Sequence, residues 1–354
     1  MGIEIKKVAV LGTGVMGSQI AAHLTNTNIE VYAFDMSQEV ANDGIENCKK
    51  LKPSPFYNIK SSSLIKPLNY DDDLEKIKEC DWVIEVISER LDWKHSLYKK
   101  IAPYIKDDCI ITSNTSGLSL SSLSKGLPNE LLNKFFITHF FNPPRYMKLV
   151  EIISSSVTDK KLVSAMDEFL TNVLGKNVVY AKDTPNFIAN RIGVYGMMIT
   201  LSEAYKRKLS IEDVDALTGT IIGRPKSATF RTADVVGLDT MCFVANTAYN
   251  DCKDDPERDI FKLPDYIQTM VDNNWLGQKT RQGFYKKIDK GLIHSLDLET
   301  MEYKPMKKNK YAAFSIAKEN TYLSDRLYSI VRVDDVAGKF LWTCFAKSLA
   351  YSAN

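Results

Sequence analysis

A glycine-rich loop near the N-terminus constrains the fold most. The apolar run 5–11 predicts a buried strand, a GxGxxG pattern follows it, and residues 18–24 have apolar positions at helical spacing. In such a strand–loop–helix unit the glycines allow a tight turn, a close approach to a pyrophosphate and helix–strand packing. The sequence therefore predicts a dinucleotide site at a helix N-terminus. The loop residues expected to contact the cofactor are Gly12, Gly14, Val15, Met16 and Gly17.

An acid follows at the place where this kind of site needs one. Residues 30–34 predict a second strand, and Asp35 ends it, 18 residues after Gly17. A carboxylate there accepts hydrogen bonds from the adenosine ribose hydroxyls and repels a 2′-phosphate. The sequence therefore predicts NAD, rather than NADP, as the cofactor.

Strands and helices alternate through the first half of the chain. This alternation predicts a doubly wound, Rossmann-like parallel sheet with its ligand crevice at the carboxyl ends of the strands. The segment 49–68 is rich in Lys, Pro and Ser and is expected to be a charged, solvated segment. The other expected strands are 82–87, 109–113, a pair within 134–153, and 177–180, and the expected helices are 37–51, about 90–104, and 159–173.

The pattern changes after residue 184, where amphipathic helices follow with no convincing strand. We expect three regions: an NAD-binding domain (1–184), an all-α substrate and dimerisation domain (185–287), and an extension of linker plus further helix (288–354). The helix at 335–353 is apolar and needs a surface to cover it, either in the second domain, in a second subunit or in a longer chain. The other helices expected here are 187–205, 210–222, 233–249 and 263–273.

A histidine and a glutamate lie in the strand pair within 134–153. His139 ends the first strand, and Glu151 lies among apolar residues of the second. Burying a carboxylate in an apolar strand is costly unless a partner compensates it. The pair can serve as a base, because the carboxylate fixes the tautomer and leaves the other ring nitrogen free for a proton. The alternative is a structural histidine with an unrelated glutamate.

Composition excludes several classes of function. The net charge of +2 gives no basic field for nucleic acid, and no run of about 18 apolar residues predicts a membrane span. No signal peptide is recognisable, so we expect a cytoplasmic protein. The six cysteines form no CxxC pair and have no metal-ligand spacing with histidine, which predicts free thiols and no metal site.

Motifs along residues 5–287 together resemble the (S)-3-hydroxyacyl-CoA dehydrogenase family. The resemblance implies NAD-dependent oxidation of a 3-hydroxyacyl-CoA to a 3-oxoacyl-CoA, as in fatty-acid β-oxidation. It also implies a homodimer formed through the all-α domain, and residues 288–354 resemble the continuation in forms fused to an enoyl-CoA hydratase. The motifs are the glycine loop with Asp35, Ser113–Ser116, His139–Pro143, Lys148–Glu151, Asp183–Arg191, 224–240 and Lys279–Tyr285.

The resemblance assigns roles position by position. His139 matches the catalytic base and Glu151 its partner, while Ser116 and Asn190 match polar residues around the substrate oxygen. Because such donors stabilise a developing oxyanion, they contribute directly to catalysis. The residues that match cofactor contacts are Asp35, Glu89, Lys94, Asn142 and Lys279.

Two departures from the family pattern and several ordinary alternatives remain. Arg281 stands where the family usually has glycine, and the family's CoA-contacting Ser and Lys have no clean counterparts after Asp35, so the CoA contacts stay open. Each polar residue also has a structural alternative. These are a helix cap for Ser116, a turn for Asn142, helix packing for Asn190, a surface ion pair for Glu89 and Lys94, and a solvated turn for Lys279.

Two other functions are compatible with parts of the sequence. One is a related NAD-dependent dehydrogenase of a sugar acid such as L-gulonate, and the other is a non-catalytic NAD- or CoA-binding module. The set Ser116, His139, Glu151 and Asn190 favours an enzyme over a binding module.

Overall fold

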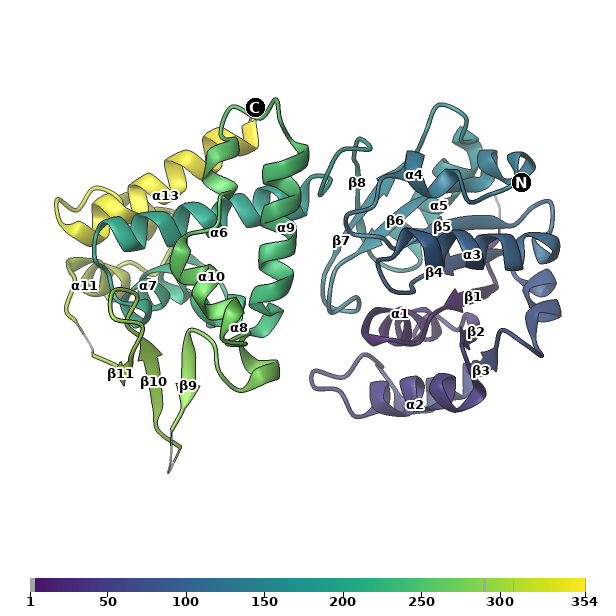
Figure 1. The fold of residues 1–354 in the computed structure, drawn as a ribbon, viewed down its shortest axis with the longest axis horizontal. Coiled ribbons are helices and arrows are strands. Elements are labelled where there is room, and N and C mark those ends of the chain that lie inside the picture. The colour runs from purple at the N-terminus through teal and green to yellow at the C-terminus, as the bar shows by residue number, and fades with distance from the viewer. Residues whose placement is uncertain (1–3, 289–290, 308, 354) are drawn as a thin grey trace. The chain divides into compact units, whose positions relative to one another are not determined.

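The computed structural model describes residues 4–288, 291–307 and 309–353, and its chain divides into two compact units after Ile188 (Figure 1). The first unit holds an eight-stranded sheet and the second is mainly helical. Residues 291–307 and 309–353 belong to the second unit. None of the helices in the described residues is long and apolar enough to cross a membrane.

The sheet of the first unit has the order β3-β2-β1-β4-β5-β6-β7-β8. All neighbouring pairs are parallel except β6 with β7, which runs antiparallel. The central strands are short apolar runs, as expected where helices cover both faces of a sheet. The strands are β1 (Lys7–Leu11), β2 (Glu30–Asp35), β3 (Ile65–Asn69), β4 (Trp82–Glu85), β5 (Ile110–Ser113), β6 (Phe135–Phe140), β7 (Leu149–Ile153) and β8 (Asn177–Tyr180).

Helices pack on both faces of this sheet and confirm the Rossmann-like prediction. One buried cluster joins the strands to α1, α2 and α5, and two others join the opposite face to α3 and α4. The side chain of Ser37 caps α2 by accepting from the Val40 N–H at 3.2 Å. The helices are α1 (Val15–Thr25), α2 (Gln38–Lys49), α3 (Leu91–Ile101), α4 (Leu120–Ser124) and α5 (Lys160–Asn172).

One strand of this sheet was missed in the sequence. β3 lies partly in the Lys/Pro/Ser-rich segment, where Lys66 and Pro67 interrupt any apolar run. It is an edge strand beside β2, so only one of its sides needs ladder partners and a proline is tolerated. The interpretation of 49–68 as a purely solvated segment was therefore wrong at its C-terminal end.

The second unit is built on helices around two buried clusters. α13 packs beside α6 and buries Phe340 and Leu341, and Tyr351 stacks on Tyr195 at 3.9 Å between ring centroids. The apolar C-terminal helix thus finds its cover within its own unit. The helices are α6 (Ala189–Lys206), α7 (Ile211–Thr218), α8 (Phe230–Val236), α9 (Leu238–Asp251), α10 (Asp265–Asp272), α11 (Ala312–Glu319), α12 (Leu323–Ile330) and α13 (Val336–Ala353).

The helical character of this unit is confirmed, but the expectation that no strand follows residue 184 was wrong. β9 (Tyr285–Lys287), β10 (Ile293–Leu296) and β11 (Tyr303–Pro305) form a small antiparallel sheet. These strands have three or four residues and are rich in Lys, Tyr and His, so no apolar run or clear alternation marks them. A helix was also divided: Gly237, with φ +97°, separates α8 from α9 where the sequence suggested one helix.

A buried carboxylate in the second unit predicts a pH-dependent stability. Asp234 accepts the backbone N–H groups of Phe284 at 2.8 Å and Tyr285 at 2.9 Å, and burial raises its pKa to about 6. Because the folded state then holds this proton more tightly than the unfolded state does, stability is lost as the pH rises from about 4 to about 6. The loss amounts to roughly 3 kcal/mol and stays constant above that range.

The measurement is the free energy of unfolding in urea between pH 4 and pH 7 for the wild type and for Asp234→Asn. The wild-type value minus the variant value should fall by roughly 3 kcal/mol across this range. A difference that does not change with pH would show that Asp234 keeps an ordinary pKa.

Candidate active site

The glycine loop has the geometry that its spacing predicted. Gly12 adopts φ +107°, and a Cβ there would lie 2.8 Å from the Val86 carbonyl oxygen. A Cβ on Gly17 would overlap the carbonyl of Gly12, whereas a Cβ on Gly14 would meet no atom within 4 Å. Two glycines are thus required by the fold itself, and the third faces open space at the N-terminus of α1.

Asp35 is held at the end of β2 by the same loop. Thr13 donates to Asp35 Oδ2 from both its N–H and its hydroxyl, each at 2.7 Å, and the Met36 N–H donates to Oδ1 at 2.8 Å. Thr13 had not been singled out in the sequence. These bonds fix the carboxylate beside the first turn of α1.

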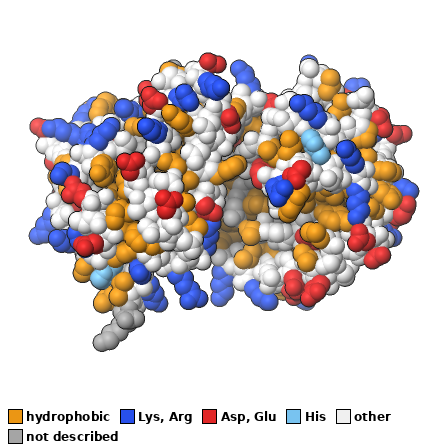
Figure 2. All heavy atoms as spheres, viewed as in Figure 1, with side chains coloured by type: hydrophobic (Ala, Val, Ile, Leu, Met, Phe, Trp, Pro, Cys, Tyr) orange, Lys and Arg blue, Asp and Glu red, His pale blue; other side chains and the backbone are white. Residues whose placement is uncertain are grey.

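A cavity of about 700 Å³ opens between the glycine loop, Asp35 and the start of α3. Its volume is in the usual range for a small-molecule site. Val15 and Met36, exposed at 67% and 75%, lie at this cavity, and Figure 2 shows hydrophobic side chains gathered between α1 and α3. Exposed apolar side chains around a concave surface are typical of a ligand site.

His139 and Glu151 form the pair that the sequence suggested. They are directly opposite each other on β6 and β7, and His139 Nδ1 lies 2.7 Å from Glu151 Oε2. Both side chains are buried, and Glu151 Oε1 accepts the Ile188 N–H at 3.0 Å. Among the described residues no hydrogen-bond partner is found for His139 Nε2, which leaves that nitrogen for a ligand.

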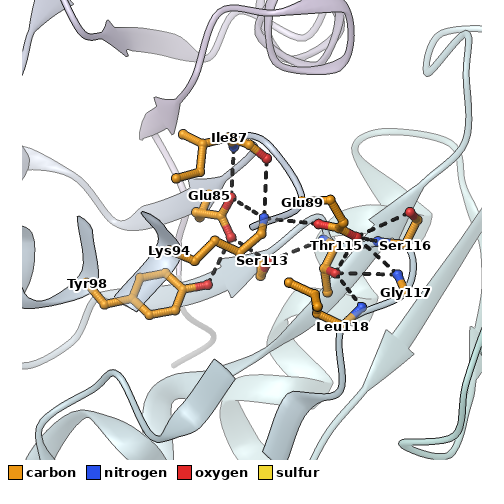
Figure 3. Close-up of polar contacts among 10 residues, drawn as sticks. All are labelled: Glu85, Ile87, Glu89, Lys94, Tyr98, Ser113, Thr115, Ser116, Gly117 and Leu118. Atoms are coloured by element: carbon orange, nitrogen blue, oxygen red, sulfur yellow. Dashed lines mark hydrogen bonds and ion pairs between the residues drawn. The ribbon is translucent and has the colours of Figure 1, made fainter. Parts of the chain in front are cut away.

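Glu89 draws together the loops that follow β4 and β5 (Figure 3). Its Oε1 accepts the N–H of Ser116 at 2.7 Å, the N–H of Gly117 at 3.1 Å and the Thr115 hydroxyl at 2.6 Å. Burial by itself raises the pKa of Glu89, but Lys94 and the bonds from Thr115 and Ser116 hold that pKa below its usual value. The structural alternative for Ser116 was wrong, because Ser119 is the residue that caps α4.

Lys94 is buried rather than part of a surface ion pair. It is 1% exposed, and its ammonium lies 2.6 Å from Glu85 Oε1 and 3.3 Å from Glu89 Oε2. Its ammonium also donates to the Ile87 carbonyl at 3.3 Å, so three protein oxygens surround it. The surface-pair alternative for Glu89 and Lys94 was therefore wrong.

Asn142 lies in the turn after β6 and contacts α1. The Gln19 side-chain amide donates to Asn142 Oδ1 at 3.2 Å, and the same amide donates to the Val15 carbonyl at 2.9 Å. This turn is also held by Lys176, whose ammonium donates to the Met147 carbonyl at 2.9 Å. Asn142 is thus brought to the helix that the glycine loop begins.

Asn190 and Lys279 belong to the second unit. Asn190 is half-buried in the first turn of α6, and Lys279 forms an ion pair with Asp239. Arg281, the departure from the family pattern, adopts φ +58°, which is the left-handed region that favours glycine. The backbone conformation suited to glycine is therefore kept in this turn.

Sequence reasoning missed one central residue, Glu85. It ends β4, is fully buried, and accepts from the hydroxyls of Tyr98 at 2.9 Å and Ser113 at 2.6 Å as well as from Lys94. The signal was available, because a carboxylate inside an apolar strand had already marked Glu151.

Known proteins with similar sequences cover nearly the whole chain. The model of the 3-hydroxyacyl-CoA dehydrogenase NAD-binding domain matches residues 7–184, and that of the C-terminal domain of the same family matches residues 187–287. A Bacillus subtilis protein named "Probable 3-hydroxyacyl-CoA dehydrogenase" is 43% identical over 99% of this chain. The chain spans about half of that relative, since 47% of its length is matched.

Two further relatives are covered over most of their length. A Deinococcus radiodurans protein with the same name is 42% identical over 80% of this chain and 84% of its own. The crystal structure of (S)-3-hydroxybutyryl-CoA dehydrogenase from Ralstonia eutropha is 27% identical, with a TM-score of 0.68 over 79% of this chain and 98% of its own. The matched NAD-binding domain confirms the predicted cofactor. The chain belongs to the 3-hydroxyacyl-CoA dehydrogenase family.

Proposed function

We propose that the protein oxidises a 3-hydroxyacyl-CoA to a 3-oxoacyl-CoA with NAD, with His139 as the general base. The observation that carries this proposal is the buried His139–Glu151 pair in a unit that also holds the NAD-binding glycine loop. The names of the relatives and of the matching family support the same substrate class.

The geometry of the His139–Glu151 pair suits a general base. An ionised Glu151 can only accept hydrogen bonds, so it holds the proton of His139 on Nδ1 and presents the lone pair of Nε2. Transfer of the substrate hydroxyl proton to Nε2 builds alkoxide character on the oxygen attached to carbon 3. A hydride can then leave from carbon 3. Glu151 then stabilises the imidazolium, and the Ile188 N–H keeps the carboxylate in place.

The residues of the first unit fit NAD, which supplies the hydride acceptor when bound. The open space at Gly14 suits a pyrophosphate, and Asp35 at the rim of the 700 Å³ cavity suits the ribose hydroxyls of an adenosine. We assign Glu89 and Asn142 to the other end of the cofactor. The residues proposed to hold the cofactor are Gly12, Gly14, Val15, Met16, Gly17, Asp35, Glu89, Asn142 and, by family resemblance, Lys94 and Lys279.

Two further side chains are assigned to the substrate oxygen. Ser116 has its backbone fixed by Glu89, which places its hydroxyl in the loop that follows β5. Asn190 is assigned by the family resemblance of the 183–191 motif. Each donor of this type contributes about 3 kcal/mol to transition-state stabilisation.

The partners and the compartment are proposed from the resemblance, from a relative's name and from the cysteines. A homodimer through the helical unit is proposed from the resemblance of 224–240 to the family's dimer-forming domain. An associated or fused enoyl-CoA hydratase is proposed because a similar Rickettsia prowazekii protein is named a putative fatty acid oxidation complex trifunctional enzyme. The six buried cysteines, none in a disulfide, support a reducing compartment such as the cytoplasm.

The direct test is NADH consumption with acetoacetyl-CoA and its longer homologues from C4 to C16. We expect turnover of at least one 3-oxoacyl-CoA, with NADPH a poor substitute because Asp35 repels the 2′-phosphate. Faster turnover of a CoA-free hydroxy acid such as L-gulonate would overturn the assignment of substrate. Binding of NADH with no turnover of any acyl-CoA would instead favour a binding module.

A further inference from the structure

A buried charge network lies beneath the loops that follow β4 and β5 (Figure 3). Glu85 is fully buried and Lys94 is 1% exposed, and Glu85 has no exposed surface with which to meet a ligand directly. Lys94 joins the two carboxylates of Glu85 and Glu89. Charges this deeply buried are costly, and a buried pair gives weak support to stability, so this one calls for another role.

Each oxygen of Glu85 is occupied. Oε1 accepts from Lys94 at 2.6 Å and from the Ile87 N–H at 2.8 Å, and Oε2 accepts from Ser113 and Tyr98. Burial and the charge of Glu85 raise the pKa of the Tyr98 phenol well above its usual value, so this phenol remains a donor. The network therefore has a fixed pattern of donors and acceptors around Glu85.

Lys94 connects the fixed carboxylate of Glu85 to Glu89, which lies nearer the surface. Besides its hydrogen bonds to Glu85 and the Ile87 carbonyl, the Lys94 ammonium forms an ion pair with Glu89 Oε2 at 3.3 Å. Glu89 Oε1 in turn gathers the backbone N–H groups of Ser116 and Gly117. The position of Glu89 and the shape of the 115–118 loop thus depend on a carboxylate at the end of β4.

We propose that Glu85 is a positioning residue that acts through Lys94 and Glu89 on the half of the cofactor site away from Asp35. This proposal rests on the proposed function, because it needs Glu89 to face NAD. The strand order β2-β1-β4-β5 separates the two halves: Asp35 ends β2, whereas Glu89 and the 115–118 loop follow β4 and β5. Glu85 then supports the cofactor without contacting it.

Glu85→Gln is the variant that separates positioning from direct contact. Glutamine has the same shape, and its amide can donate to the Tyr98 and Ser113 hydroxyls while its carbonyl accepts from Lys94 and Ile87. The charge that holds Lys94 is lost, so the ammonium shifts toward Glu89. Lys94 itself remains present in this variant.

The readout is the dissociation constant of NADH beside that of ADP, which occupies only the adenosine half. We expect Glu85→Gln to bind NADH about tenfold more weakly, the change that corresponds to one weakened charge-assisted hydrogen bond, with ADP within about twofold of the wild type. The matched control is Asp81→Asn, one residue before the other end of β4, where Asp81 binds Lys106 and two backbone N–H groups. That variant should lose thermal stability and keep both affinities.

Two results would overturn the proposal. Wild-type NADH affinity in Glu85→Gln would show that the network only stabilises the fold. Equal losses of affinity for NADH and ADP would show that Glu85 does not act on one half of the site. If Glu85→Gln does not fold, Tyr98→Phe removes one bond to Glu85 and should give a smaller loss that is again specific for NADH. A wild type that binds NADH but turns over no acyl-CoA would refute the proposed function alone. The affinity comparison would still decide the role of Glu85.

Discussion

His139→Gln is expected to lower kcat with acetoacetyl-CoA and NADH by about a thousandfold, because general acid–base catalysis contributes a factor of this order. Glutamine keeps a polar group opposite Glu151 on β7 but offers no nitrogen that can take and return a proton. NADH affinity should stay within about twofold, since the glycine loop and Asp35 do not involve this side chain. Steady-state kinetics and an NADH titration measure the two effects.

The control for this variant is His95→Gln in the same unit. His95 lies on α3, and its Nε2 is 2.8 Å from the Ser122 carbonyl, away from the strand pair. This variant should keep wild-type kcat. A His139→Gln enzyme with more than about a tenth of wild-type kcat would refute the base assignment, since the loss would then fall below the range of acid–base catalysis.

The parts of the fold that sequence reasoning could predict are those with strong local signals. The glycine loop, the apolar strands β1, β2 and β5 and the capped helix α2 each have a pattern that depends on a few neighbouring residues. β3 and the small β9–β11 sheet have no such pattern, because an edge strand or a three-residue strand buries too little to require apolar residues. Their pairing is decided by neighbours distant in sequence, such as β2 for β3.

The candidate site divides in the same way. His139 and Glu151 could be paired from the sequence because a carboxylate inside an apolar strand needs a partner and His139 ends the preceding strand. The structure places them directly opposite each other. Glu85 and Glu89 are linked through Lys94 on the next helix, and no rule of sequence spacing predicts this contact. A carboxylate at the end of an apolar strand is nevertheless a usable signal by itself, since burial obliges it to find partners.

Two alanine variants of the glycine loop are expected to have large but different effects, one on stability and the other on NADH affinity. Gly17→Ala places a Cβ on the Gly12 carbonyl, and because both positions are backbone, no side-chain rotation relieves the overlap. We expect this variant to lose about 3 kcal/mol of stability, the upper range for overpacking in a core, or to remain unfolded. Thermal unfolding measures this loss.

Gly14→Ala should fold normally but bind the cofactor poorly. Its backbone, at φ −62° and ψ −168°, is allowed for alanine, and the new Cβ meets no protein atom within 4 Å. A methyl group there occupies the space that a pyrophosphate needs, so we expect a thermal midpoint like that of the wild type and NADH affinity reduced by about a hundredfold. Unchanged NADH affinity would mean that the phosphates do not approach this backbone. Because stability and affinity separate in the two variants, the pair distinguishes a glycine that the fold requires from one that the ligand requires.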